Sequence, residues 1–156
     1  MALSLEQAAA IGIAYLAASL GVIEYTQLAA GETLLVAGAG GGVGTAAAHI
    51  GRWRGARAIG VDRHELPSES PAAAALDDFF SLEGKALDEV IRRATGGRGA
   101  QVIVDSVGGP MFKPASKSLG RPSRQVETTS VGDRRVSFDF VDFYHNERAT
   151  SSAFSR

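Results

Sequence analysis

The segment from Thr33 to Ile50 constrains the fold of this chain more than any other part of the sequence. A short apolar stretch leads into the glycine-rich turn Ala39-Gly-Gly-Gly-Val-Gly44, and an alanine-rich stretch follows the turn. This order predicts a strand, a tight turn and a helix. The spacing Ala39-x-Gly41-x-x-Gly44 is that of a dinucleotide-binding fingerprint, with Ala39 in place of its first glycine.

Each position of this turn has its own steric requirement. The chain must turn sharply at 39–40, its backbone must approach a pyrophosphate at Gly41, and a side chain at Gly44 would push the helix off the sheet. A helix that begins near Val43 would present its free N–H groups and its positive dipole end to the phosphates. We therefore take Gly41, Gly42, Val43 and Gly44 as candidate cofactor-binding residues. The alternative is a glycine-rich turn in another kind of α/β protein.

A second expected strand, at about 57–62, ends in Asp62. Asp62 follows Gly44 by 18 residues, close to the distance of about 20 at which a carboxylate binds the adenosine ribose hydroxyls. A carboxylate at this position repels a 2′-phosphate and so favours NAD(H) over NADP(H). Arg63 can stack on adenine or accommodate that phosphate, so NADP(H) remains an alternative. Without a ligand role, Asp62 and Arg63 would simply form a solvent-exposed strand end.

Strands alternate with helices through most of the chain. Further strands are expected at 78–81, 101–104, 124–129 and 136–140, and helices at 5–20, 22–30, 85–95 and 114–119. This alternation predicts an α/β fold, a Rossmann-type doubly wound parallel sheet with helices on both faces, preceded by an N-terminal helix. Ser4 and Gln7 resemble a capping box at the start of that first helix, and Gly21 is expected to end it.

The carboxyl ends of parallel strands should gather further candidate residues at one edge of the sheet. Ligands of such sheets bind beyond these ends, and the turns at 39–44, 105–109 and 129–132 would all open there. Candidate cofactor-binding residues in the last two turns are Asp105, Ser106, Val107 and Ser130. We expect Asp105 and Ser106 to point at the same crevice as Gly41, although Asp105 is equally suited to capping the segment after it.

Composition excludes several other classes of protein. The net charge of −1 gives no reason to expect a nucleic-acid partner, and the absence of cysteine excludes disulfides and thiolate metal sites. The three histidines lack metal-ligand spacing, and no catalytic residue stands out. The uncharged stretch between Glu6 and Glu24 is expected to be a buried or interface helix, with no membrane association, since the first basic residue is Arg52. A cytoplasmic location is expected.

Three segments resemble the medium-chain dehydrogenases/reductases, above all their zinc-free, quinone-oxidoreductase-like branch. They are 7–15, 31–36 together with the glycine turn, and 104–109. The resemblance implies a nicotinamide-dinucleotide-binding domain with strand order 3-2-1-4-5-6, usually in a homodimer. It also implies that residues 1–147 form this domain, that 148–156 are a divergent or disordered tail, and that the family's N-terminal catalytic domain is absent. The altered tail places the homodimer in question.

The resemblance also has consequences for metal binding and activity. Zinc-dependent relatives usually place a metal-ligand cysteine in the stretch that reads Ala8-Ala-Ala10 here, so no zinc is expected. Residues often threonine near the nicotinamide are Ala14 and Ala17. We expect the cofactor domain of an NAD(P)-dependent oxidoreductase with a small-molecule substrate in its full-length form, and no activity of this chain alone. The alternatives are a non-catalytic NAD(H)-sensing module and a methyltransferase that binds S-adenosylmethionine.

Overall fold

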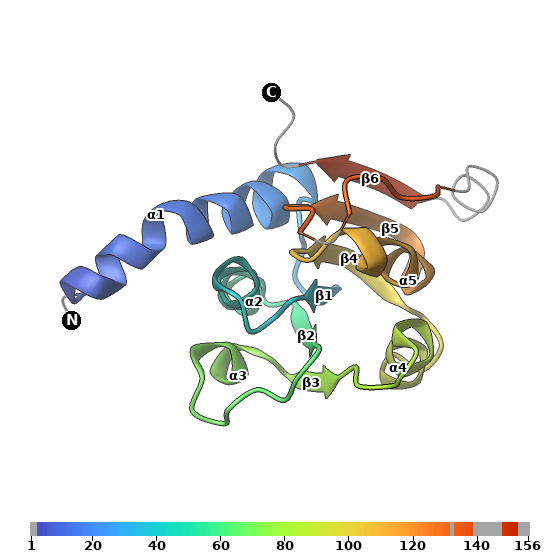
Figure 1. Cartoon of the computed structure of the whole chain (residues 1–156), viewed down its shortest axis with the longest axis horizontal. Coiled ribbons are helices and arrows are strands. Elements are labelled where there is room, and N and C mark those ends of the chain that lie inside the picture. Colours follow the sequence, from blue (N-terminus) through green and yellow to red (C-terminus); the bar gives the residue numbers. More distant parts are fainter. Residues whose placement is uncertain (1–2, 132, 139–147, 153–156) are drawn as a thin grey trace.

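Six parallel strands form the central sheet in the part of the chain that the computed structural model describes, residues 3–131, 133–138 and 148–152 (Figure 1). They are β1 (Thr33–Ala37), β2 (Arg57–Asp62), β3 (Asp78–Ser81), β4 (Ala100–Asp105), β5 (Leu119–Glu127) and β6 (Arg148–Ser152). Their order across the sheet is β3-β2-β1-β4-β5-β6, and every neighbouring pair is parallel. This confirms the expected doubly wound sheet, whose strand order reverses between β1 and β4.

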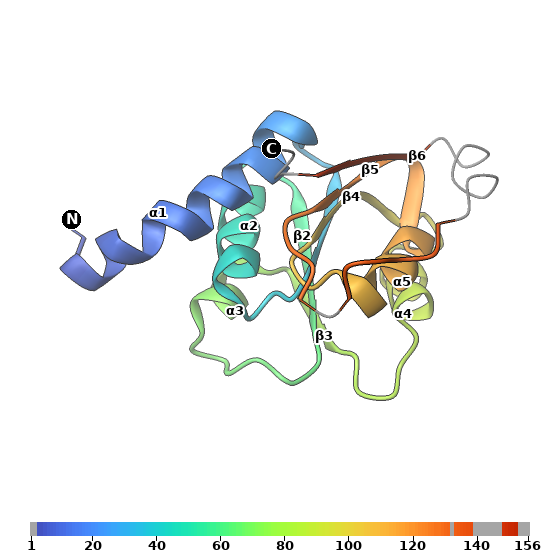
Figure 2. The same cartoon turned by 45° about the horizontal axis from the view of Figure 1, so that its top comes forward.

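Helices cover both faces of the sheet, as Figures 1 and 2 show. One face carries α1 (Leu5–Ser19), the π-helix η1 (Leu20–Tyr25), α2 (Gly42–Trp53) and α3 (Pro71–Ala75). The other face carries α4 (Leu87–Ala94), the short 3-10 helix η2 (Gly109–Met111) and α5 (Phe112–Lys117). The N-terminal part of α1 extends beyond the edge of the sheet in both views.

The central strands are apolar throughout because both of their faces are covered. On β1, Leu34 and Val36 pack into the core beneath α1 and α2, and Leu35 and Ala37 pack into the core beneath α4 and α5. All four side chains are fully buried. A continuous apolar run of this kind is typical of a strand inside a parallel sheet. The sheet therefore separates two hydrophobic cores, one on each of its faces.

The N-terminal helix begins as expected and ends later than expected. Ser4 accepts a hydrogen bond from the Gln7 N–H and the Gln7 side chain accepts one from the Ser4 N–H, which confirms the capping box. Gly21 does not end the helix, because α1 continues directly into η1 as far as Tyr25. A Cβ atom on Gly21 would lie 3.2 Å from the Val126 Cγ1 atom of β5. The glycine therefore lets the helix pack closely on the sheet.

This continuous helix, Leu5–Tyr25, is long and apolar enough to cross a membrane by length and composition alone. Length and composition are a weak criterion, since core helices of many soluble proteins also meet it. Several contacts tie the C-terminal half of the helix to the domain. Ala17, Ala18 and Val22 are buried, and the Tyr15 hydroxyl hydrogen-bonds the His49 ring of α2. These contacts agree with the expectation of a packed helix for its C-terminal half only, because Leu5 and Ile13 in the N-terminal half are 87% and 83% exposed.

The sixth strand lies later in the chain than the sequence indicates. The alternating stretch at 136–140 was expected to supply it, but residues 136–138 are not a strand and 139–140 lie outside the described residues. The strand is Arg148–Ser152, which pairs with β5 from Ser123 to Glu127. The sheet thus extends into the segment for which a divergent or disordered tail was expected. Alternation alone identified the wrong segment because a short run of apolar residues also occurs in extended loops.

Candidate functional site

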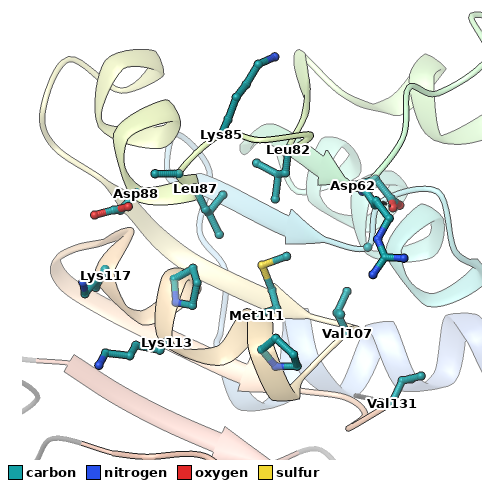
Figure 3. Close-up of a pocket in the computed structure, with 15 residues that line it drawn as sticks. Asp62, Leu82, Lys85, Leu87, Asp88, Val107, Met111, Lys113, Lys117 and Val131 are labelled. Atoms are coloured by element: carbon teal, nitrogen blue, oxygen red, sulfur yellow. Dashed lines mark hydrogen bonds between the residues drawn. The ribbon is translucent and has the colours of Figure 1, made fainter. Parts of the chain in front are cut away.

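A cleft of about 610 Å³ lies at the carboxyl edge of the sheet, beside the point where strand order reverses. Figure 3 shows Asp62, Val107 and Val131 at one end of it, Met111 in the middle, and Asp88, Lys113 and Lys117 at the other end. Crevices at this position of open α/β sheets bind ligands. Of the candidate residues from the sequence, Asp62, Arg63 and Val107 line the cleft directly.

The glycine turn adjoins this cleft through Gly38, which lines it and has a positive φ of 76°. The sharpest steric constraint is at Gly44, where a Cβ atom would lie 2.1 Å from the Gly38 carbonyl oxygen and 2.9 Å from the Ala39 Cα. No side chain fits at that distance. The expectation that Gly44 brings the helix close to the sheet is therefore confirmed.

The N-terminus of α2 leaves donor groups available. Gly41 is the N-cap residue in extended conformation, and its carbonyl accepts the first helical bond from the Thr45 N–H at 2.8 Å. The N–H groups of Gly42, Val43 and Gly44 have no acceptor among the described residues. Free N–H groups at the positive end of a helix dipole make a site for an anion such as a phosphate.

Asp62 stands at the end of β2, half-buried at the rim of the cleft. Its Oδ2 atom accepts a hydrogen bond from the Gly40 N–H at 3.0 Å, and its Oδ1 atom accepts one from the Arg63 N–H at 2.7 Å. These bonds fix the carboxylate against the glycine turn, and each oxygen keeps a further lone pair. Asp62 is thus oriented to accept hydrogen bonds from a ligand in the cleft.

The three candidate residues in the turn after β4 make different contacts. Val107 lines the cleft. The Ser106 hydroxyl donates to the Ala37 carbonyl oxygen at 2.7 Å, so it joins β4 to β1 and does not line the cleft. Asp105 is fully buried, and its Oδ1 atom accepts hydrogen bonds from the N–H groups of Val107 and Gly108. Asp105 does not point into the crevice as expected; it caps its own turn, which is the alternative that the sequence left open. A ligand role for Ser106 stays a prediction.

The turn after β5 reaches the cleft through Val131 and not through the candidate Ser130. Ser130 is exposed, and its hydroxyl donates to the Asp133 carbonyl oxygen. Val131 lines the cleft and donates its N–H to the Val107 carbonyl oxygen at 3.1 Å. A Cβ atom on Gly108 would lie 2.4 Å from the Thr129 carbonyl oxygen, so the two turns are in close contact. The turns after β4 and β5 therefore form one wall.

A pair of carboxyl groups lies beneath this wall. Asp105 and Glu127 are register partners at the ends of β4 and β5. Burial, followed by the charge of Asp105, raises the pKa of Glu127 to about 8. Burial also raises the pKa of Asp105, opposed by the hydrogen bonds from the Gly108 and Val107 N–H groups. At neutral pH the pair holds at least one proton, because the buried carboxylate of Asp105 and the half-buried carboxylate of Glu127 would repel each other.

Sequence reasoning missed the half of the cleft formed by α4, η2 and α5. The missed lining residues include Leu82, Lys85, Leu87, Asp88, Met111, Lys113, Lys117 and Val131. The topology could have predicted this half, because the turn after β3 and the segment after β4 both follow carboxyl ends of parallel strands, where ligands bind. No group of three or more histidine, cysteine or acidic residues that could hold a metal ion occurs in the described ranges.

Gly38 and Asp62 line the cleft, whereas Gly41, Gly42, Val43 and Gly44 lie beside it in the adjoining turn. The residues present fit a dinucleotide, because close-packed glycine backbone, free helix N–H groups and an oriented carboxylate lie next to one another at the carboxyl edge of the sheet. The fold and this site together define a dinucleotide-binding domain of the Rossmann type. The particular family follows from comparison with known sequences. Residues 42–155 match the family model described as zinc-binding dehydrogenase, and the chain belongs to this family, within the medium-chain dehydrogenases/reductases.

Known relatives and structures agree with this assignment. The chain is 35% identical over 121 residues to a quinone oxidoreductase-like protein 2 homolog from Nematostella vectensis, covering 75% of this chain and 32% of the relative. It is 30% identical over 137 residues to a mycocerosic acid synthase-like polyketide synthase from Mycolicibacterium smegmatis, covering 88% of this chain and 6% of that protein. The crystal structure of an NAD-dependent alcohol dehydrogenase superposes with a TM-score of 0.89 at 27% identity, covering 96% and 44% of the two chains.

The chain therefore spans less than half the length of these relatives. The structural match covers nearly the whole chain, so it includes most of the N-terminal helix as well as the sheet. The resemblance seen in the sequence is confirmed at the level of the family and the nucleotide-binding domain.

Proposed function

We propose that this chain is the nicotinamide-dinucleotide-binding domain of an NAD(P)-dependent oxidoreductase. The observation that carries the proposal is the contact between Gly44 and Gly38, which seats the N-terminus of α2 against the end of β1 and so places its free N–H groups at the carboxyl edge of the sheet. When bound, the nicotinamide cofactor supplies the hydride chemistry. The names of the matched oxidoreductases support this reaction class for the full-length protein.

Each part of the cleft then has a distinct task. The N–H groups of Gly42, Val43 and Gly44 would hold the pyrophosphate, and Gly41 leaves room for it. Asp62 would bind the adenosine ribose hydroxyls, and the exposed Arg63 would cover the adenine. We propose NAD(H) as the preferred cofactor because the Asp62 carboxylate stands where a 2′-phosphate would be repelled.

The full-length protein would reduce or oxidise a small molecule by the hydride transfer typical of quinone oxidoreductases and alcohol dehydrogenases. No zinc is needed in this proposal. The homodimer and the cytoplasmic location stay predictions from the sequence.

Titration of the purified chain with NADH and, in parallel, NADPH tests cofactor choice. Binding is followed by the fluorescence of the reduced nicotinamide, and NADH is expected to bind more tightly. Asp62→Ser should weaken NADH binding by about tenfold, since a charge-assisted hydrogen bond is lost, and should narrow or reverse the preference. Glu24→Ser is a matched control, because Glu24 is an exposed carboxylate on η1 that does not line the cleft. Failure of both nucleotides to bind would contradict the proposed function.

The isolated chain is expected to show no turnover. This chain matches 44% of the length of the alcohol dehydrogenase structure, and we infer that a complete substrate pocket needs the part of the full-length protein that this chain does not cover. Incubation with NADH and p-benzoquinone or an enone, followed at 340 nm, should give the same rate as buffer. NADH consumption that scales with the concentration of the chain would show that this domain is an enzyme by itself.

A further inference from the structure

The carboxyl pair formed by buried Asp105 and half-buried Glu127 leaves one oxygen of Asp105 without a donor. Its Oδ1 atom accepts from the Val107 N–H at 2.8 Å and the Gly108 N–H at 3.0 Å. Its Oδ2 atom is buried and receives no hydrogen bond from a conventional donor among the described residues. A buried acceptor without a donor is costly, so this atom requires a partner.

Among the described residues, Glu127 is placed to be that partner. It is the register partner of Asp105, and its carboxyl group lies within hydrogen-bonding reach of Asp105. One of its oxygens, Oε1, accepts a hydrogen bond from the Gln125 side chain, whose own oxygen accepts one from the Ser116 hydroxyl at 2.9 Å. This chain of bonds engages one oxygen of Glu127 and leaves the second available to Asp105. A carboxyl group donates a hydrogen bond only when it carries a proton.

Asp105 in turn holds the wall of the cleft. Its Oδ1 atom fixes the backbone of Val107, and the Val107 carbonyl oxygen accepts the Val131 N–H. Val107 and Val131 both line the cleft, at the same end as Asp62 in Figure 3. The Asp105 carbonyl oxygen also accepts the Thr128 N–H at 2.9 Å. The position of the wall therefore depends on the orientation of one buried carboxylate.

We propose that protonated Glu127 is a positioning residue for the nucleotide cleft, because it donates its proton to Asp105 and so holds the turn that carries Val107. The proposal rests on the proposed dinucleotide-binding function. Loss of the proton would place two carboxylates in contact in a poorly solvated site, and their repulsion would displace the turn. Glu127 itself does not touch the cleft.

The charged groups on the neighbouring elements do not substitute for this proton. Glu127 and Asp105 are the principal charges that act on each other. On β5, Arg124 is paired with Glu32 at 2.8 Å, and the exposed Lys113 and Lys117 of α5 line the cleft. η2 and β1 carry no charged residue. The remaining charged residues on the packed elements are Glu24 on η1, Arg121 and Arg148 on strands, and Asp133, Arg134 and Arg135 after β5.

The first test is the pH dependence of NADH binding from pH 6 to 9.5. Wild-type affinity should fall by about tenfold as the pH rises through about 8, as expected when a buried hydrogen bond is replaced by repulsion. Glu127→Gln retains a donor that cannot ionise, so its affinity should match that of the wild type at pH 6.5 and stay constant to pH 9.5. Glu127→Leu removes the donor and should bind weakly at every pH. The same pH profile for the wild type and Glu127→Gln would overturn the proposal.

The second test needs no ligand and separates this proposal from the proposed function. Amide hydrogen exchange, measured by NMR, reports whether the Val107 and Gly108 N–H groups are held by Asp105. Their protection factors should drop above pH 8 in the wild type and persist in Glu127→Gln. Unchanged protection in the wild type would refute the positioning role even if NADH binds. Loss of NADH binding with the expected protection pattern would refute the proposed function and leave the positioning of the turn supported.

Discussion

Replacing Gly44 with alanine is expected to abolish measurable NADH binding and to lower the free energy of unfolding by about 3 kcal/mol. The added Cβ atom would lie 2.1 Å from the Gly38 carbonyl oxygen. Both contacting groups are backbone, so neither can rotate away, and α2 must shift relative to β1. The shift would move the N–H groups of Gly42 and Val43 away from the proposed pyrophosphate position. Nucleotide binding would then be lost together with stability.

The measurement is urea unfolding together with NADH titration, with Gly12→Ala as the matched control. A Cβ atom on Gly12 of α1 would meet no atom within 4 Å. Alanine in an exposed helix interior is favoured over glycine by about 1 kcal/mol, so this control should be neutral or stabilising. A Gly44→Ala variant that keeps full stability and full NADH affinity would show that the turn tolerates a side chain, contrary to the geometry described above.

The glycine turn was predictable because its requirements are local. The fingerprint places Gly44 and Asp62 at fixed distances along the chain, and both occupy the expected positions at the start of α2 and the end of β2. The alternation of strands and helices likewise predicted a doubly wound sheet, since parallel strands need crossovers and crossovers are right-handed. These features depend on short-range patterns and on general rules of topology.

The remaining features depend on contacts between distant segments. A glycine ends a helix in many sequences. In this chain, however, Gly21 allows η1 to pack on Val126, which lies more than a hundred residues later. Asp105 follows a buried strand, as ligand-binding acids often do, yet its side chain turns back to cap Val107 and contacts Glu127. The sequence of β4 does not indicate that Glu127, at the end of β5, lies directly beside Asp105. This proximity depends on the register between the two strands.

That register leads to a second large expected effect, on the pH dependence of stability. The pKa of Glu127 is raised from 4.5, the value expected in an unfolded chain, to about 8 in the folded protein. Between these values the folded chain keeps a proton that the unfolded chain releases. The free energy of unfolding therefore falls as the pH rises from 4.5 to 8, by up to about 1.4 kcal/mol per pH unit from this group, and the contribution is constant above pH 8.

Glu127→Gln isolates this contribution, because glutamine keeps the shape and the donor but binds no titrating proton. The free energy of unfolding of the variant minus that of the wild type should rise by about 3 kcal/mol between pH 5 and pH 8, measured by urea unfolding at intervals of half a pH unit. Glu89→Gln on α4 is the matched control for the loss of one exposed carboxyl group. A difference between Glu127→Gln and the wild type that stays constant with pH would mean that the folded protein tolerates both carboxylates, and that the end of β5 is more hydrated than its burial indicates.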